Sequence, residues 1–447
     1  MNYKQTNIFD FLVESLTHNI SSIEDTRKQR SNIIYSLKDI ILSAFSIFYF
    51  QNKSWLSFQR DIETKKGISN AQTMFGIKAI PSDTHIKNIL DKITPDSFRK
   101  IYEMIIEKLQ DIGILDKFNF KDDYMLVALD GTHYHSSKKI SCKCCQTKKD
   151  KESGEVHYYH SVITPTIVHP DIKKVIPLMQ EFISNNDGDD KQDCEINASK
   201  RWLDSFVNPT SKKLVILGDD LYSRFPMIEK VIQKNHSFIF VAKEKSHKVL
   251  YKTIENYKQT NAVKTYTISV IKNGKKQIYT YNYINNILLN GNKEDNLEVN
   301  WCELIITNLD GKKLHTFSYV TDIKLTQNSV QDIITAGRTR WKIENENNNT
   351  LKTKGYHLNH NFGHGDENLS KTLCSLNILA FLFHTVQELD DELYVELHSN
   401  IGTREEFFIG INFLTTMFNF KSFNKMLEYI LIARQTEQNV DMKGYVV

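Results

Sequence analysis

The chain has 447 residues, of which 40% are hydrophobic, 25% are charged and 11% are aromatic. This composition excludes a wholly disordered protein, and the length suggests about three domains. Lysine and arginine number 57 against 54 aspartates and glutamates, so the formal net charge is only +3. Net charge alone therefore does not indicate a nucleic-acid-binding protein, although local basic patches could still serve that purpose.

The sequence gives no sign of export or membrane insertion. The first residues lack a basic head followed by an apolar stretch, so we expect no signal peptide. The most apolar runs, at 40–50 and 373–383, are too short or too interrupted to cross a bilayer, which needs about 20 residues. Six cysteines are too few for a disulfide scaffold in a chain of this length. The sequence therefore predicts a cytoplasmic protein with no membrane partner.

Residues 1–120 are predicted to be helical, because apolar residues recur at three- and four-residue steps. The pattern changes at 124–129, a continuous apolar run that ends in Asp130. Strand-like runs follow at 156–168 and 174–183.

A helix is predicted at 191–207, and a second continuous apolar run at 214–218 ends in Asp219 and Asp220. A further helix at 226–235 and a strand at 237–243 complete a mixed α/β order. Continuous apolar runs are typical of central strands that are buried on both faces. Open α/β sheets tend to place their sites at one edge, where we expect these carboxylates to gather.

Residues 246–324 are predicted to be all-β. Asn273 and Gly274 separate two alternating runs, which is the strongest short signal for a hairpin, and Asp310-Gly311 repeats it. Helical pattern resumes near Ser329, and the tail from about Leu369 is helical again.

The acids are weak signals individually. An aspartate at the end of a strand is usually a loop or capping residue, and Glu344 could simply pair with Arg340 on an exposed helix. In this chain order, however, Asp130, Asp219 and Glu344 can converge on one site. Three carboxylates suit Mg²⁺, and two such ions can activate an attacking water and stabilise the leaving oxygen of a phosphodiester.

Three motifs carry a resemblance to a known family. The segments ALDGT at 128–132, ILGDDLY at 216–222 and RWKIE at 340–344 resemble motifs of bacterial insertion-sequence DDE transposases, in the group with an Arg-Trp-x-Ile-Glu signature. The resemblance covers about 120–385. It implies metal-dependent cleavage at the terminal inverted repeats of a mobile element and strand transfer into target DNA.

The resemblance also implies a domain organisation. An RNase H-like catalytic core with a mixed sheet would occupy 121–245 and 325–385, interrupted by a β-rich domain at 246–324. A helical DNA-binding region would lie at 1–120, and a helical C-terminal region at 386–447. The expected partners are double-stranded DNA and a second copy of the chain, in the bacterial cytoplasm and associated with the nucleoid.

By the same resemblance, Asp130, Asp219 and Glu344 would be the catalytic residues and would bind two Mg²⁺ or Mn²⁺ ions. Neighbours on a strand point to opposite faces, and the spacing to Tyr222 favours Asp219 over Asp220. The register of Arg340-Trp341 likewise favours Glu344 over Glu346, which helix geometry turns roughly 200° away.

The sequence departs from the family pattern at three places. Gly337 occupies the position of a tyrosine, Leu351 that of a lysine, and asparagines fill 347–349. These departures leave two alternatives open: an RNase H-like metal nuclease without strand transfer, or a catalytically impaired DNA-binding protein derived from a transposase.

A second metal site is predicted from cysteine and histidine spacing. Cys142 and Cys145 have the C-x-x-C spacing of half a zinc site, and His157 and His160 follow. The predicted ligands of a structural Zn²⁺ are Cys142, Cys145 and His160, with Cys194 as a candidate fourth. The alternative is that these residues lie on a hairpin without a metal. His364, in a glycine-flanked turn, could approach a phosphate or only shape its loop.

Basic residues flank the proposed acidic site. Lys138 and Lys139 belong to a lysine-rich connector, and Lys352 or Lys354 could replace the missing lysine of the family. Together with Arg340 they are predicted to contact DNA phosphates, unless Arg340 only pairs with Glu344. Trp301 is predicted to stack on an unpaired base at the cleaved DNA end, or to belong to a sheet face.

Overall fold

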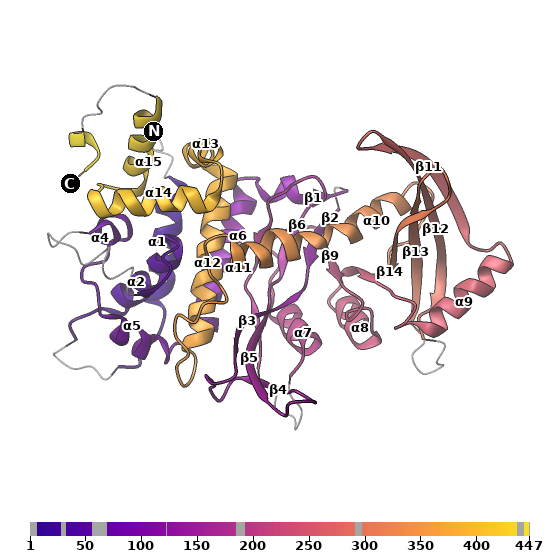
Figure 1. The fold of residues 1–447 in the computed structure, drawn as a ribbon, viewed down its shortest axis with the longest axis horizontal. Coiled ribbons are helices and arrows are strands. Elements are labelled where there is room, and N and C mark those ends of the chain that lie inside the picture. The colour runs from indigo at the N-terminus through magenta and orange to yellow at the C-terminus, as the bar shows by residue number, and fades with distance from the viewer. Residues whose placement is uncertain are drawn as a thin grey trace.

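The computed structural model describes residues 7–27, 33–55, 69–121, 123–184, 193–290, 297–435 and 442–446. The molecule is elongated (Figure 1). Helices from both ends of the chain form one end, mixed sheets lie in the middle, and long antiparallel strands form the other end.

The helical end is built around one long helix, α12 (Leu369–Asp390). Short polar side chains begin several of its neighbours: Ser36 accepts a hydrogen bond from the backbone N–H of Asp39, and Ser69 forms a capping box with Gln72. The helices around α12 are α1 (Ile8–Ser21), α2 (Leu37–Tyr49), α4 (Asn70–Phe75), α5 (Asp83–Leu90), α6 (Arg99–Asp111), α13 (Glu392–Ile401), α14 (Arg404–Met417) and α15 (Phe423–Gln435).

Helix α12 is longer than its apolar run predicts. Among the described helices, it alone has the length and composition that could span a membrane. However, 89% of its most apolar window is buried inside the protein. The helix therefore serves as the core of the helical end, which explains why it is apolar on all sides.

The predicted N-terminal and C-terminal helical regions form one body. The hydroxyl of Tyr49 donates to Oε1 of Gln387 at 2.7 Å, and the side-chain amide of Asn70 donates to the carbonyl of Thr415 at 2.8 Å. Helix α12 also crosses the predicted boundary at 385/386. The described parts of 1–120 and 386–447 are mainly helical, and they share a single core.

The central sheet runs in the order β7-β6-β2-β9-β10. Strands β2, β9 and β10 are parallel to one another, while β6 is antiparallel to both β2 and β7. The middle strands are buried almost throughout, which confirms the prediction from their continuous apolar runs. The bounds are β1 (Asn119–Phe120), β2 (Tyr124–Ala128), β6 (Thr166–Val168), β7 (Ile176–Pro177), β9 (Lys213–Gly218) and β10 (Ser237–Val241), with helices α7 (Glu195–Ser205) and α8 (Phe225–Gln233) between them.

Some of the predicted strands belong to a second sheet and not to the central one. The apolar runs at 156–168 and 174–183 each divide between the two sheets, because the chain bends at Thr164-Pro165 and after Pro177. The backbone N–H of Thr164 bonds the carbonyl of Asp130 at 3.1 Å, so Asp130 lies where the sheets meet. The second sheet contains β3 (Gly131–Ser137), β4 (Gln146–Lys149), β5 (Val156–Ile163) and β8 (Glu181–Ile183).

The segment predicted to be all-β begins with a helix, α9 (Lys248–Gln259), so that prediction is wrong at its start. Its strands extend the central sheet, because β14 pairs antiparallel with β10. The predicted hairpin is confirmed: Asn273 and Gly274 both have positive φ, 50° and 73°, as a two-residue turn of type I′ requires. The strands are β11 (Lys264–Lys272), β12 (Lys275–Leu288), β13 (Glu298–Thr307) and β14 (Lys313–Thr321).

The chain then returns to the central sheet through helix α10 (Val330–Thr339), a π-helical segment (Ile343–Asn348) and helix α11 (Asn349–Thr353). Gly337 allows this return, because a Cβ there would lie 2.7 Å from the ring of Tyr319 on β14. Short π-helical segments are frequent at functional sites, and this one contains Glu344.

Candidate functional site

The three predicted acids lie together at one edge of the central sheet. Strands β2 and β9 are parallel neighbours, so Asp130 and Asp219 emerge at the same edge. Arg340 links them to the third acid: its guanidinium lies 2.7 Å from Oε1 of Glu344 and 3.9 Å from Oδ1 of Asp130. Residues more than 200 positions apart thus form one acidic cluster.

Asp219 and Asp220 face different surroundings. The negative charge of Asp219 acts on Asp130, whereas the carboxylate of Asp220 accepts from the backbone N–H of Lys243 at 2.7 Å and from the hydroxyl of Ser246. Asp220 therefore stabilises the turn before α9. The structure places only Asp219 with the acidic cluster, in keeping with the spacing to Tyr222.

Glu344 and Glu346 also separate. Arg340, Glu344 and Asn348 follow one another at four-residue steps, and all three interact with Asp130. Glu346 instead lines a groove on the side of the inserted strands, close to Lys342. Glu344 therefore lies with the acidic cluster and Glu346 does not, in keeping with the helical register of Arg340-Trp341.

A fourth carboxylate, Glu195, was missed in the sequence. It is the first residue of α7, and its Oε1 accepts from the backbone N–H of Gly131 at 3.1 Å and from the hydroxyl of Tyr222 at 2.8 Å. A Cβ on Gly131 would lie 2.7 Å from Oε2 of Glu195, and one on Gly218 would lie 2.6 Å from the Tyr222 ring. These contacts give a physical reason for the glycines and the tyrosine in the motifs. Acids are common in first helical turns, so no local signal distinguished Glu195.

Asn348 was also missed. Its side-chain amide donates to Oδ2 of Asp130 at 2.9 Å, and its Oδ1 accepts from the hydroxyl of Thr164 at 2.7 Å and from the amide of Asn347 at 2.9 Å. The asparagine run, which departs from the family pattern, therefore supplies the group that orients Asp130.

The cluster carries excess negative charge. Burial raises the pKa of Asp130 to about 7, helped by the charges of Glu195, Glu344 and Asp219 and opposed by Arg340. Burial also raises the pKa of Glu195. The side chains of Asp130 and Glu344 are 20% and 46% exposed, so solvent reaches the cluster. Several carboxylates that retain access to water offer oxygen atoms of the kind that Mg²⁺ prefers.

The predicted basic residues fall into three groups. Arg340 is buried and pairs with the acids, so it does not present its charge to the surface. Lys352 is half-buried close to Asp130, and burial lowers its pKa while the charge of Asp130 opposes that change. Lys354 and Lys139 are exposed, and Lys138 is exposed but pairs with Glu155 at 2.6 Å.

Trp301 cannot play its predicted role in this structure. Its side chain is 0% exposed, and its indole N–H donates to the hydroxyl of Ser318 at 3.0 Å. The ring packs against Tyr251 inside the sheet, so no base can reach it. The prediction that Trp301 stacks on DNA is therefore wrong, because a strand pattern alone does not tell which face a helix covers.

A groove of about 880 Å³ lies between α10 and the inserted strands. Trp341, which is 61% exposed, lines it together with Lys272 and Lys275. The guanidinium of Arg338 lies over the ring of Phe317 at 4.5 Å in the same groove. Aromatic rings interleaved with cations form a surface suited to nucleic acid.

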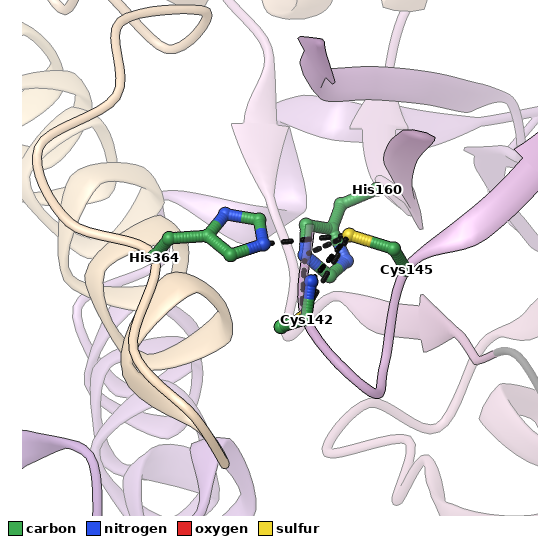
Figure 2. Close-up of side chains that lie close together, drawn as sticks. All are labelled: Cys142, Cys145, His160 and His364. Atoms are coloured by element: carbon green, nitrogen blue, oxygen red, sulfur yellow. Dashed lines mark hydrogen bonds between the residues drawn. The ribbon is translucent and has the colours of Figure 1, made fainter. Parts of the chain in front are cut away.

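A separate cluster of cysteines and histidines lies beside the second sheet (Figure 2). Cys142, Cys145, His160 and His364 each offer one ligand atom, and these four atoms all lie within 4.8 Å of one another. Burial lowers the pKa of His160 to about 3, so its imidazole is neutral and able to bind a metal. The predicted Cys142, Cys145 and His160 thus come together. Cys194, the candidate fourth ligand, is instead exposed at the start of α7, and His364 takes that place.

A scan against models of known protein families found no match for this chain. A search of curated protein sequences also found none.

Proposed function

We propose that the protein is a DDE-type transposase that cleaves DNA at the ends of a mobile element and joins the freed ends to target DNA. The observation that carries the proposal is the convergence of Asp130, Asp219 and Glu344 at one sheet edge. They come from two parallel strand ends and from a helix that follows an inserted β-rich segment.

The strand order supports an RNase H-like core for this proposal. Strands β7, β6 and β2 are antiparallel, and β9 and β10 then add in parallel on the other side of β2. The proposed core excludes β11–β14, which continue the same sheet beyond β10. This insertion separates Asp219 from Glu344 in sequence while the fold brings them together.

The cluster offers ligands for divalent cations. Asp130, Asp219 and Glu344 would hold Mg²⁺, with Glu195 adjoining them. When bound, such ions supply charge stabilisation for the attacking and leaving oxygens of a phosphodiester. Arg340 orients Glu344 through its 2.7 Å ion pair, and Asn348 orients Asp130 through its 2.9 Å hydrogen bond.

The surface around the cluster supports a DNA substrate. Lys352 lies close enough to Asp130 for their charges to interact, so a phosphate at the acids would meet its ammonium. The groove with Trp341 and Arg338 opens on the other face of the same helical segment. Terminal inverted repeats as substrate, and a dimer that pairs two ends, follow from the motif resemblance.

The test compares each proposed ligand with a nearby acid in the sequence whose carboxylate lies outside the acidic cluster. The substrate is DNA that spans either side of the gene, with any inverted repeats found there, in the presence of Mg²⁺. We expect Asp219→Asn and Glu344→Gln each to lower strand cleavage about a thousandfold or more, since each removes a ligand to a catalytic cation. The matched Asp220→Asn and Glu346→Gln should cleave within about threefold of wild type, because their carboxylates lie outside the cluster.

If Asp220→Asn lowered strand cleavage as much as Asp219→Asn, or Glu346→Gln as much as Glu344→Gln, the proposed acids would not be the ligands. Cleavage by the wild-type protein without joining of pre-cleaved ends would instead identify a nuclease. End binding without any Mg²⁺-dependent cleavage would identify a DNA-binding protein that has lost catalysis.

A further inference from the structure

We propose that Cys142, Cys145, His160 and His364 bind one structural Zn²⁺ that fastens the β3–β5 sheet to the loop carrying His364. The proposal does not rest on the proposed function, because it concerns a second cluster with different chemistry.

The distances within the cluster fit a tetrahedral zinc site. Zinc binds sulfur at about 2.3 Å and histidine nitrogen at about 2.0–2.1 Å, so a regular tetrahedron separates two sulfurs by about 3.8 Å and a sulfur from a nitrogen by about 3.6 Å. The Sγ atoms of Cys142 and Cys145 are 3.8 Å apart. Nε2 of His160 lies 3.4 Å from each sulfur, and Nε2 of His364 lies 3.4 Å from Sγ of Cys145.

The contacts of the cluster centre on Cys145. Its Sγ has three close neighbours, two imidazole nitrogens and the sulfur of Cys142. The backbone N–H of Cys142 also donates to Sγ of Cys145 at 3.3 Å. Two thiolates and two imidazoles around one centre satisfy every contact if the centre is a cation.

Local structure holds the ligands in place without the help of a metal. The backbone N–H of Cys145 bonds the carbonyl of Cys142 at 3.2 Å, and this turn brings the two sulfurs to the same side. His160 lies within strand β5 and stacks on Tyr134 of the neighbouring β3, with ring centroids 5.4 Å apart. Such pre-organisation lowers the entropic cost of binding an ion.

The site has four protein ligands. Cys145 and His160 are each 1% exposed, Cys142 and His364 are partly buried, and the four ligand atoms would fill every position of a tetrahedral ion. Structural zinc sites have this form, whereas catalytic sites leave one position for water or substrate. Two sulfur and two nitrogen ligands in a tetrahedron select zinc over the harder cations that the carboxylates suit.

The ligands also explain what the ion would do. Three come from the segment 142–160, and His364 comes from the loop between α11 and α12, more than 200 positions later (Figure 2). Strand β3 starts next to Asp130, and the loop follows the helical segment with Glu344 and Asn348. One Zn²⁺ would therefore hold together two of the parts of the chain that supply the acidic cluster.

The experiment measures metal directly on the full-length protein, with no DNA present. Protein purified from zinc-supplemented cells should contain about one zinc per chain by elemental analysis. After replacement by Co²⁺, the visible spectrum should show tetrahedral bands together with sulfur-to-cobalt charge transfer. Cys142→Ser should lower that charge-transfer intensity by about half, since one of two thiolates is lost.

Cys144→Ser is the matched control. Cys144 lies between the two proposed ligands, but its sulfur is directed to the carbonyl of Glu367 at 3.5 Å. This variant and Cys194→Ser should keep one zinc and an unchanged cobalt spectrum, while His364→Asn should lose most of the metal. The proposal is overturned if wild type contains no stoichiometric zinc, or if Cys144→Ser loses as much as Cys142→Ser. A protein two mass units lighter than its reduced form, with no metal, would show a disulfide pair instead.

Discussion

The acidic cluster and the cysteine–histidine cluster flank the same pair of strands, β3 and β5, yet they differ in every property that governs metal binding. The first offers oxygen atoms, remains partly open to solvent and brings like charges together. The second offers two sulfurs and two nitrogens, is largely buried and leaves no position free. An open oxygen site suits ions that arrive with a phosphate substrate, whereas a closed sulfur site suits an ion that stays.

The two clusters should also affect the stability of the fold in opposite directions. Burial and the neighbouring negative charges raise the pKa of Asp130, so its charged form costs folding free energy. The cysteine–histidine cluster should instead contribute folding free energy when its ion is bound.

The largest expected effect comes from removing the metal of the closed cluster. Treatment with a strong zinc chelator should lower the melting temperature by about 5 °C or more, because binding free energy of a structural ion is folding free energy. Dialysis against Mg²⁺-free buffer should shift it by less than about 1 °C. Scanning calorimetry checks both values, and equal shifts would remove the distinction between the clusters.

Next in size is the loss of a group that orients a proposed ligand. Asn348→Ala should lower Mg²⁺-dependent DNA cleavage about 10–100-fold, because Asp130 loses its 2.9 Å hydrogen bond. Asn349→Ala is the control, since Asn349 is exposed and does not contact the acids. Added Mg²⁺ should partly restore Asn348→Ala in a titration of cleavage rate. Unchanged cleavage by Asn348→Ala would show that Asp130 is oriented without it.

The cost of burying the charged form of Asp130 beside other acids predicts a smaller, opposite change in stability. The pKa of Asp130 is raised from its ordinary value near 3.8 to about 7, so between these values the unfolded chain releases a proton that the folded protein keeps. Stability therefore falls as pH rises from about 4 to 7 and stays low above that. In divalent-free buffer at pH 8, Asp130→Asn should be more stable than wild type by about 1–2 kcal/mol in urea unfolding. At pH 3 the two proteins should be equal in stability, and a variant less stable than wild type at pH 8 would contradict this cost of charging Asp130.

The smallest effect concerns a single phosphate contact. Lys352→Ala should weaken binding of the DNA end several-fold and reduce the salt slope of log K by about 0.9. Lys354→Ala should change neither as much, because Lys354 is exposed, whereas Lys352 is half-buried and close enough to Asp130 for their charges to interact. Binding titrations at several salt concentrations measure both quantities. A larger loss of DNA affinity for Lys354→Ala would indicate that the DNA phosphates lie near Lys354 and not near the acids.

Much of the fold could be predicted because its signals are local. The buried runs that become β2, β9 and β10, the Asn273-Gly274 turn and the helical texture of both ends follow from periodicity and turn chemistry. Helix α9 was missed because its amphipathic pattern lies in a segment otherwise dominated by alternating residues. The division of 156–168 between two sheets was missed because a bend at Thr164-Pro165 leaves the apolar run itself unbroken.

The sequence by itself determined which strands end in acids and which cysteines are spaced for a metal. Its motifs also favoured Asp219 over Asp220 and Glu344 over Glu346. Only the tertiary structure decided that Glu195 and Asn348 join the acids and that His364 replaces Cys194. It also decided that Trp301 is buried while Trp341 is exposed. The reason is that local patterns depend on neighbours along the chain, whereas a site's members meet through packing between segments more than 200 positions apart.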